Sequence, residues 1–274
     1  MDTKNFHTWL GINEPGVIVF DCPAGEVAVV CRAKPVPDRL NEDALGVFPV
    51  GRNLAVLVVA DGMGGVAGGD KAAALVVTTI GEHLAELPDE AESAPIRAAL
   101  LVGIEEANHR ILGLGIGAGT TVAAAVVSPR RFGTVHAGDS MVLVVGQRGR
   151  LKAQTLAHSP VGFAQEAGLI DADQAMFHHE RHLVTNVVGM EGLRLEIGSP
   201  RRFSPRDTLI LGSDGLFDNL TVPEVLNRIR CGPLAASAAE VADLAIRRMI
   251  EPRPEEPSKP DDLGMILFRP APKK

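Results

Sequence analysis

The apolar positions follow two different periods along the chain, and the change between them divides it into blocks. Short apolar and β-branched runs, separated by Gly, Pro, Asn and Asp, come first and are typical of strands. They span residues 17–20, 27–32, 44–50 and 54–60. Residues 70–87 and 96–112 then carry apolar positions at helical spacing, which predicts two helices separated by Pro88.

The second half of the chain repeats this order of strands followed by helices. Strand-like runs span residues 120–127, 132–137, 141–145, 193–197 and 208–211. Residues 222–230 and 235–250 are predicted helices, and a last strand at 265–268 follows a Pro-rich loop. Because strand blocks and helix blocks are segregated, the pattern favours an α+β layered domain over a parallel doubly wound sheet. We interpret residues 1–274 as a single domain.

Composition and charge narrow the classes of function. Of the 274 residues, 46% are hydrophobic and 4% are aromatic, and the formal net charge is -7. A nucleic-acid-binding protein needs a basic surface and aromatic rings for stacking, so we expect no nucleic-acid partner. The N-terminus lacks the basic start and apolar stretch of a signal peptide, and no apolar run is long enough to cross a membrane. We therefore expect a soluble cytoplasmic protein with no membrane partner.

Three aspartates stand next to predicted strands. Asp61 follows the run 54–60, Asp214 follows the run 208–211, and Asp261 precedes the last strand. Aspartate is common in turns, which explains any one of them alone. Together they predict a cation site, because clustered carboxylates are costly to bury without a positive charge. Oxygen ligands select Mg²⁺ or Mn²⁺ over Zn²⁺, and one bridging carboxylate can hold two such ions about 3.5–4 Å apart.

Residues 62–67 also fit the pattern G-x-G-x-x-G/A of a dinucleotide-binding loop, since they follow a predicted strand and precede a predicted helix. Two features oppose this interpretation. Asp61 would repel a pyrophosphate, and Glu82, the acidic residue about 20 positions further on, falls within a predicted helix. We therefore expect these glycines to form a tight turn whose backbone carbonyl can reach a metal ion.

Seven short motifs, in this order along the chain, resemble the bacterial form of the PP2C (PPM) family of metal-dependent protein serine/threonine phosphatases. They are R-L-N-E-D at 39–43, D-G-M-G-G at 61–65, G-T-T at 119–121, A-G-D-S at 137–140, H-S at 158–159, S-D-G-L at 213–216 and D-D at 261–262. The resemblance implies a four-layer αββα sandwich, in which two antiparallel β-sheets are flanked by helix pairs and the metals lie at one end. It also implies a flap within residues 151–191 and leaves residues 1–16 as an interaction arm or a covering strand.

The resemblance implies a centre of two Mn²⁺ or Mg²⁺ ions. Asp61 would bridge both ions, and Asp214 and Asp261 would complete the first site. A metal-bridging water or hydroxide would attack the phosphorus in line, so Asp61 and Asp214 count as catalytic residues and no phosphoenzyme is expected.

Further residues are expected around the second ion and a third one. Gly62 would bind the second ion through its carbonyl, and Glu42 would do so through a water, with Asp43 in the same motif. Asp139, together with Asp214, would hold a third, looser ion.

The chain departs from the family pattern at the phosphate-binding arginine and near the C-terminus. That arginine usually stands four residues before the glutamate, where this chain has Asp38. We predict that Arg39 binds phosphate instead, and Arg32 or Lys34 are alternatives. Asp262 replaces the usual asparagine after the last metal-binding aspartate, so the hydrogen bonds behind the site are expected to differ.

Three histidines, His178, His179 and His182, lie in the flap segment. The i, i+4 spacing of His178 and His182 would suit a metal if the segment were helical. Because the sequence matches neither H-E-x-x-H nor its inverted form, we favour a solvated polar face over a zinc site. Contact with the phosphorylated substrate is a third interpretation that stays open.

Two functions from different classes follow from these patterns. The first is a phosphatase that hydrolyses phosphoserine and phosphothreonine in protein substrates, opposes a bacterial protein kinase, and acts as a monomer. The second is a catalytically weak or inactive PP2C-like regulatory or binding module, for which the displaced Arg39 and Asp262 are the reasons. The complete set of Asp61, Asp214 and Asp261 favours the first, and a dinucleotide-binding enzyme is a distant third.

Overall fold

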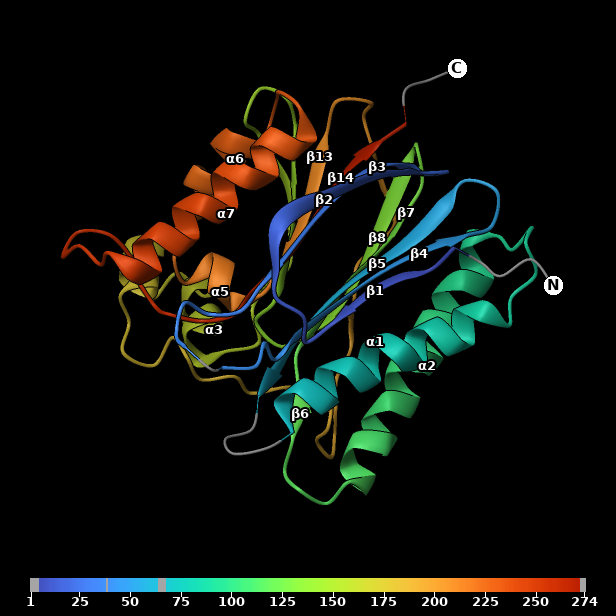
Figure 1. Ribbon diagram of the computed structural model, residues 1–274, viewed down its shortest axis with the longest axis horizontal. Coiled ribbons are helices and arrows are strands. Elements are labelled where there is room, and N and C mark those ends of the chain that lie inside the picture. Colours follow the sequence, from blue (N-terminus) through green and yellow to red (C-terminus); the bar gives the residue numbers. More distant parts are fainter. Residues whose placement is uncertain (1–4, 38, 64–67, 272–274) are drawn as a thin grey trace.

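The structure is a computed structural model that describes residues 5–37, 39–63 and 68–271. Two antiparallel sheets pack face to face, and a group of helices covers the outer face of each (Figure 1). The four-layer αββα sandwich implied by the sequence is therefore confirmed.

The first sheet has the strand order β1-β4-β5-β7-β8-β11, with β6 paired to β5 and β12 paired to β8. Its strands are β1 (His7–Leu10), β4 (Asp43–Val50), β5 (Leu54–Met63), β6 (Gly119–Thr120), β7 (Val122–Val127), β8 (Arg131–Ala137), β11 (Glu196–Ile197) and β12 (Arg201–Arg202). β5 runs antiparallel to both β4 and β7. β5 is thus no part of the parallel unit that a dinucleotide-binding loop requires, and residues 64–67 of the G-x-G-x-x-G/A pattern lie outside the described residues.

The second sheet has the strand order β10-β9-β13-β14-β3-β2. Its strands are β2 (Glu14–Cys22), β3 (Gly25–Arg32), β9 (Met141–Val145), β10 (Leu151–Gln154), β13 (Thr208–Gly212) and β14 (Leu263–Pro270). The strand at the end of the chain, β14, lies between β13 and β3, so both ends of the sequence contribute to this sheet.

Two long helices, α1 (Gly69–Ala85) and α2 (Ser93–Gly113), cover the first sheet, and α6 (Val222–Ile229) with α7 (Leu234–Ile250) cover the second (Figure 1). Three short helices lie near the ends of strands, namely α3 (Pro160–Glu166), α4 (Ala172–Met176) and α5 (Asp214–Phe217). Within the described part of the chain, every helix is too short or too polar to span a lipid bilayer.

Strand β5 explains why the apolar runs are continuous in the sequence. Both of its faces are covered, because successive side chains of a strand point to opposite sides of the sheet. Val56, Val58 and Ala60 pack towards α1 and α2, whereas Leu57 and Val59 pack between the two sheets. A third apolar layer lies between the second sheet and α6 and α7.

The structure contains one strand that was not predicted, near the N-terminus, and shortens one predicted strand. Within residues 1–16, His7–Leu10 pairs with β4 as an edge strand of the first sheet. The predicted strand 193–197 is reduced to β11, because Leu193 and Leu195 turn towards the apolar layer beneath α1 and α2 instead of pairing.

Candidate metal centre

Carboxylates from five segments meet at one end of the sandwich. This acidic cluster consists of Asp43, Asp61, Asp139, Asp214, Asp218 and Asp261. Asp43 and Asp61 stand opposite each other in the β4–β5 register. Burial raises the pKa of Asp61 well above its usual value, and the negative charges of Asp214, Asp43, Asp139 and Asp261 raise it further. The structure thus brings together aspartates that are up to 218 residues apart in the sequence.

The electrostatics of this cluster match a cation site. Burial raises the pKa of Asp139 to about 8, and repulsion from Asp214 and Asp218 adds to the effect. Burial and the charge of Asp214 raise the pKa of Asp218 to about 6. Among the described residues, the buried oxygens Asp43 Oδ1 and Asp139 Oδ1 have no hydrogen-bond partner. An oxygen-only donor set with unmet acceptors suits Mg²⁺ or Mn²⁺, so the residues fit the ions that the family pattern implies.

Hydroxyl groups from neighbouring strands fix the backbone of Asp61. The Thr120 hydroxyl and the Thr121 backbone N–H both donate to the Asp61 carbonyl, at 2.8 and 2.9 Å. The Asp61 N–H donates to Thr121 Oγ1 at 3.2 Å, and that hydroxyl lies 2.6 Å from Ser140 Oγ. Because Ser140 follows Asp139 directly, the G-T-T and G-D-S motifs hold these two aspartates in a fixed relation.

The glycine after Asp214 allows two acidic loops to touch. A Cβ on Gly215 would lie 1.8 Å from the Asp262 carbonyl oxygen, so any other residue would push α5 away from the loop before β14. The preceding Ser213 donates its hydroxyl to Asp43 Oδ2 at 2.8 Å. The S-D-G motif therefore joins the start of β4, the end of β13 and the loop before β14.

Gly62 and Glu42 lie together at the start of α1. The Gly62 N–H donates to the Glu42 carbonyl at 3.2 Å. A Cβ on Gly62 would lie 2.2 Å from the Gly69 carbonyl oxygen, which explains why this position requires glycine. Burial raises the pKa of the Glu42 carboxyl, the charge of Asp262 raises it further, and Arg39 lowers it. Glu42, Gly62 and Arg39 thus lie in one neighbourhood, as the motifs predict.

Lys259 contributes an ammonium group that the sequence analysis did not predict. Its Nζ lies 2.9 Å from Asp218 Oδ2 and 3.2 Å from Asp261 Oδ2, and it donates a short hydrogen bond to Asp214 Oδ2. The segment 252–260 reads as a polar surface loop, and a lysine two positions before a predicted metal ligand was the one signal available.

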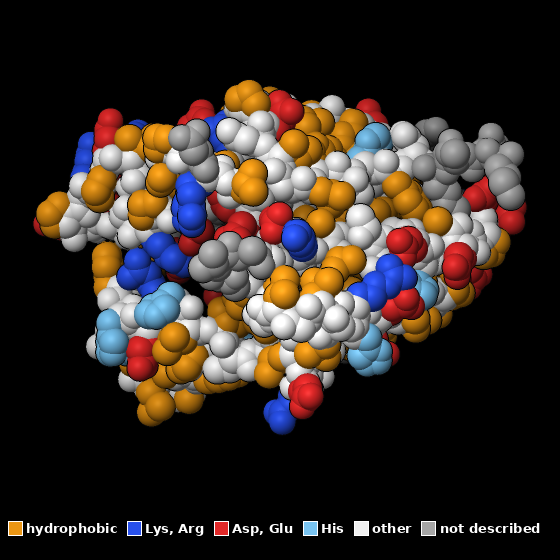
Figure 2. All heavy atoms as spheres, turned by 60° about the horizontal axis from the view of Figure 1, so that its bottom comes forward, with side chains coloured by type: hydrophobic (Ala, Val, Ile, Leu, Met, Phe, Trp, Pro, Cys, Tyr) orange, Lys and Arg blue, Asp and Glu red, His pale blue; other side chains and the backbone are white. Residues whose placement is uncertain are grey.

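A cavity of about 350 Å³ opens beside the acidic cluster. Asp139 and Asp214 line it together with Val161 of α3 and Met176 of α4. Figure 2 shows acidic side chains at the bottom of a hollow on this side of the molecule, with Lys and Arg side chains next to them. The predicted flap segment therefore forms one wall of a space that reaches the carboxylates.

Comparison with known proteins identifies the family. A sequence profile described as Protein phosphatase 2C matches residues 36–246. The chain belongs to the protein phosphatase 2C family. The serine/threonine phosphatase stp of Listeria welshimeri is 30% identical over 215 residues, which cover 76% of this chain and 83% of that protein. The predictions of this family and of a protein serine/threonine phosphatase are thereby confirmed.

Solved PP2C structures share the fold. The serine/threonine phosphatase of S. agalactiae superposes with a TM-score of 0.76 at 25% identity, covering 89% of this chain and 99% of that one. The catalytic domain of the phosphatase PstP in complex with two manganese ions gives a TM-score of 0.68 at 26% identity, covering 89% and 96%. A two-ion manganese centre is therefore compatible with this fold, and the individual ligand roles in this chain stay predictions.

Asp262, which replaces the usual PP2C asparagine, uses both of its carboxylate oxygens. Oδ1 accepts the Lys34 N–H and Oδ2 accepts the Glu42 N–H, each at 2.7 Å. An asparagine side chain offers one oxygen and could accept only one of these bonds with the same geometry. Asp262 thus anchors the segment 34–42, which carries Arg39, against the loop before β14.

The candidates for phosphate binding differ in their surroundings. Arg32 is held by Asp243 of α7, with Nη1 and Oδ1 2.9 Å apart, so it is engaged away from the cluster. Arg39 is exposed. The flap adds a basic residue that the sequence analysis missed, because Arg181 Nε lies 3.9 Å from Asp218 Oδ1 in the acidic cluster.

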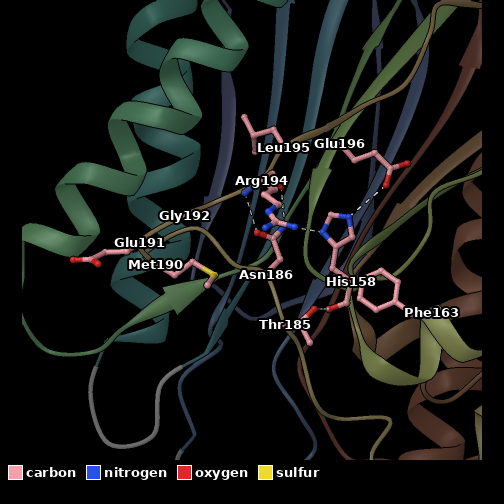
Figure 3. A pocket seen from close by; sticks show the side chains of 10 residues that line it. All are labelled: His158, Phe163, Thr185, Asn186, Met190, Glu191, Gly192, Arg194, Leu195 and Glu196. Carbon is pink, nitrogen blue, oxygen red and sulfur yellow. Dashed lines mark hydrogen bonds and ion pairs between the residues drawn. The ribbon is translucent and has the colours of Figure 1, made fainter.

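The histidine of the PP2C H-S motif lies in a second group of ligating side chains. Among the described residues, His136, His158 and Glu196 are the one trio of His, Cys, Asp or Glu whose donor atoms all lie within 4.8 Å of one another. His158 and Glu196 line a cavity of about 730 Å³ (Figure 3). No three carboxylates of the acidic cluster meet this criterion in the described ranges.

The hydrogen bonds of His158 define its tautomer. Nδ1 accepts the Gly138 N–H at 3.2 Å and the Asn186 amide at 2.7 Å. The Asn186 amide orientation is fixed, because its Oδ1 accepts the Arg194 N–H and its Nδ2 donates to the Arg194 carbonyl. The proton of the neutral ring therefore sits on Nε2, which faces Glu196 at 3.4 Å (Figure 3).

His136 also directs a protonated nitrogen towards Glu196. Its Nε2 lies 2.8 Å from the Leu156 carbonyl, so this nitrogen carries the proton, and burial lowers the pKa of the ring. With both Nε2 atoms protonated, neither of these two nitrogens offers a lone pair to an ion beside Glu196, and the lone pair of the buried His136 Nδ1 has no hydrogen-bond partner among the residues that the structure describes. His158 positions Gly138, the residue before Asp139, through two hydrogen bonds. Its ring Nδ1 accepts the Gly138 N–H, and its backbone N–H donates to the Gly138 carbonyl at 2.9 Å.

The flap histidines lack the helical geometry that a zinc site would need. Helix α4 ends at Met176, and residues 178–182 form turns. His178 Nδ1 accepts the Glu180 N–H at 3.1 Å, and the rings of His178 and His179 stack with centroids 4.6 Å apart. The i, i+4 spacing of His178 and His182 therefore does not place them one helical turn apart.

Proposed function

We propose that the protein is a two-ion phosphatase that hydrolyses phosphoserine and phosphothreonine in protein substrates. The observation that carries this proposal is the convergence of Asp61, Asp139, Asp214 and Asp261 at one end of a PP2C sandwich, where burial and mutual repulsion call for cations. When bound, Mn²⁺ or Mg²⁺ supplies Lewis acidity towards phosphoryl oxygens and lowers the pKa of water. The manganese complex of the PstP neighbour supports this choice of ion.

The carboxylates of the chain hold and space the two ions. Asp61 would bridge them, since its backbone is fixed by Thr120 of β6 and its carboxylate is repelled by several neighbouring aspartates. Asp214 and Asp261 would complete the first ion site. Gly62 through its carbonyl and Glu42 through a water would hold the second.

Three further residues serve the substrate side and the support of the site. Arg39, exposed near Glu42, would bind the phosphate group and orient it for attack. Asp43, whose Oδ2 accepts the Ser213 hydroxyl, supports the centre from β4. Asp139 lines the cavity into which the phosphorylated side chain would enter.

In the cell, such an enzyme would oppose a serine/threonine kinase of the same bacterium, acting on the kinase or on its targets. We place it in the cytoplasm as a monomer. The bacterial phosphatases among its relatives support this setting, and the acidic net charge of -7 gives no reason to expect a nucleic-acid partner.

The second candidate is a regulatory module with little or no activity. Two observations favour it, namely that Arg39 stands one position later than the arginine of the family pattern and that Asp262 adds a further negative charge behind the site. A module of this kind would bind phosphoprotein without turnover. The surplus of carboxylates opposes it, because a scaffold gains nothing from mutual repulsion.

Hydrolysis of a phosphothreonine peptide tests the proposal. The wild-type protein should turn over the peptide with Mn²⁺, lose activity in EDTA, and lose it as Asp61→Asn or Asp214→Asn. Asp243→Asn is the matched control, because its carboxylate is 68% exposed on α7 and outside the cluster. A folded, manganese-loaded wild-type protein without turnover would contradict the phosphatase and favour the regulatory module.

A further inference from the structure

Lys259 is the one lysine that enters the acidic cluster within the described residues. Its Nζ contacts oxygens of Asp214, Asp218 and Asp261, and its side chain is 25% exposed. Its contacts do not include Asp61, the residue expected to bridge the two ions. The ammonium therefore lies on the side of the cluster formed by α5 and the loop before β14, next to the first ion site and towards Asp218.

The backbone of Lys259 is held in place by a buried side chain. Asn219 Oδ1 accepts the Lys259 N–H, and Asn219 Nδ2 donates to the Lys259 carbonyl, both at 2.8 Å. The same amide nitrogen donates to the Gly215 carbonyl at 2.9 Å, and Arg248 donates to the Asn219 carbonyl at 2.7 Å. A lysine fixed by two backbone bonds in this way delivers its charge to a defined place, unlike a lysine on a mobile surface.

The ammonium uses the same oxygens that a third ion would need. Such an ion is expected between Asp139 and Asp214, yet Asp214 Oδ2 already accepts the hydrogen bond of Lys259. Burial and the charge of Asp214 raise the pKa of Asp139 and Asp218, and the charge of Lys259 offsets part of this rise at both acids. A divalent cation placed there would face a like charge at short range inside the protein, where repulsion is strong.

We propose that Lys259 is a tethered cation that takes the place of a third divalent ion, so that the protein binds two ions and not three. This inference rests on the proposed two-ion function, and it concerns the chain's own residue rather than the ions. The fixed charge neutralises the Asp214–Asp218 side of the cluster permanently, whereas the Asp61 side depends on added metal.

Counting bound manganese tests the inference. Isothermal titration calorimetry and equilibrium dialysis with Mn²⁺ should give two ions per chain for the wild type and three for Lys259→Met. Lys259→Arg keeps the positive charge and should return the count to two. The matched control is Lys152→Met, which removes a lysine paired with the buried Asp207 at a distance from the cluster and should leave the count at two.

Thermal unfolding gives a second measurement that does not depend on activity. In EDTA, Lys259→Met should melt about 5 °C or more below the wild type, because Asp214, Asp218 and Asp261 then lose the cation that they share. Added Mn²⁺ should raise its melting temperature more than that of the wild type or of Lys152→Met. If Lys259→Met does not fold without metal, Lys259→Gln purified with Mn²⁺ replaces it in the titration.

The outcomes separate the inference from the proposed function. Three ions on the wild type, or an unchanged count in Lys259→Met, would overturn the inference and leave a metal-dependent phosphatase standing. A wild-type protein that binds no Mn²⁺ would overturn the proposed function and the inference with it.

Discussion

The two ends of strand β13 carry buried acids with opposite balances of charge. At its start, Asp207 is 3% exposed, and both carboxylate oxygens lie 2.7 Å from Lys152 Nζ. Beyond its other end, Asp214 shares one lysine, Lys259, with Asp218 and Asp261. One acid therefore has a base to itself, whereas at the other end three acids share Lys259, and a second base, Arg181, lies 3.9 Å from Asp218 alone among them.

This difference separates a structural acid from a functional one. The Lys152–Asp207 pair is complete without any added ion, and Asp207 also accepts the Ser204 N–H at 2.9 Å. In the acidic cluster, burial and repulsion raise the pKa of Asp61 and Asp139, so the folded chain holds acids that it does not neutralise by itself. Buried carboxylates without a neutralising base are costly for stability, so we interpret them as ligands for cations.

The largest expected effect distinguishes the two ends by activity. Asp61→Asn should lower the rate of phosphothreonine-peptide hydrolysis at least about a thousandfold, since it removes the residue shared by both ions. Asp207→Asn is the matched control and should leave the rate of the folded enzyme within about twofold. Equal losses of hydrolysis rate in the two variants would contradict the difference between the two ends of β13. Initial rates at saturating Mn²⁺ provide the measurement.

The second largest effect is expected at the basic residue that binds the phosphate group. Arg39→Ala should lower kcat/KM about 10- to 100-fold, because a charge-assisted bond to phosphate is lost. Arg32→Ala should have little effect, since Arg32 pairs with Asp243 at 2.9 Å. Steady-state kinetics on one peptide would decide, and a large loss in Lys34→Ala with none in Arg39→Ala would move the phosphate contact to Lys34.

At the Lys152–Asp207 end of β13, a substitution should change the stability of the protein rather than its activity. Lys152→Met should reduce the free energy of unfolding by about 1–3 kcal/mol, because it leaves Asp207 buried without its base. The loss should be the same in EDTA and in Mn²⁺, since no ion binds at this end. Urea unfolding in both buffers measures it. A loss that Mn²⁺ repairs would mean that the Lys152–Asp207 end also binds metal.

The smallest effect is the pH dependence of the metal-free protein. In the folded state the pKa of Asp139 is raised to about 8, above the value of about 3.9 for an unfolded chain. The folded protein then binds more protons than the unfolded one, so this group stabilises it at low pH and the contribution is lost as the pH rises towards 8. In EDTA the melting temperature should fall from pH 5.5 to pH 8.5, and less so in Asp139→Asn. Equal slopes in the two proteins would exclude Asp139 as the cause.

The apolar pattern predicted an α+β layered domain because β5 and its neighbours are buried on both faces and their runs are long and apolar, and the resemblance to the PP2C family implied the sandwich. The sequence also predicted which aspartates meet, since Asp61, Asp214 and Asp261 border such strands. The structure of β1 and the shortening of β11 were not foreseen, because pairing at sheet edges depends on distant strands rather than on local pattern.

Other parts of the site could not be predicted because they depend on contacts between distant segments. Lys259 reads as a surface lysine in a Pro-rich loop, and only the fold brings it to Asp214, 45 residues away. Asp262 reads as a lost asparagine, yet its two oxygens anchor backbone groups of Lys34 and Glu42. Thr120 and Thr121 read as strand residues, while their hydroxyls bind the backbone of Asp61 and the hydroxyl of Ser140, the residue after Asp139.

The most direct test of the central claim, that surplus acid at one end of β13 is a two-ion centre, is anomalous diffraction at the manganese edge. Crystals grown with Mn²⁺ should show two anomalous peaks bridged by Asp61, one of them bound by Asp214 and Asp261, and none beside Lys152 and Asp207. A map without a peak at Asp61 would contradict the account.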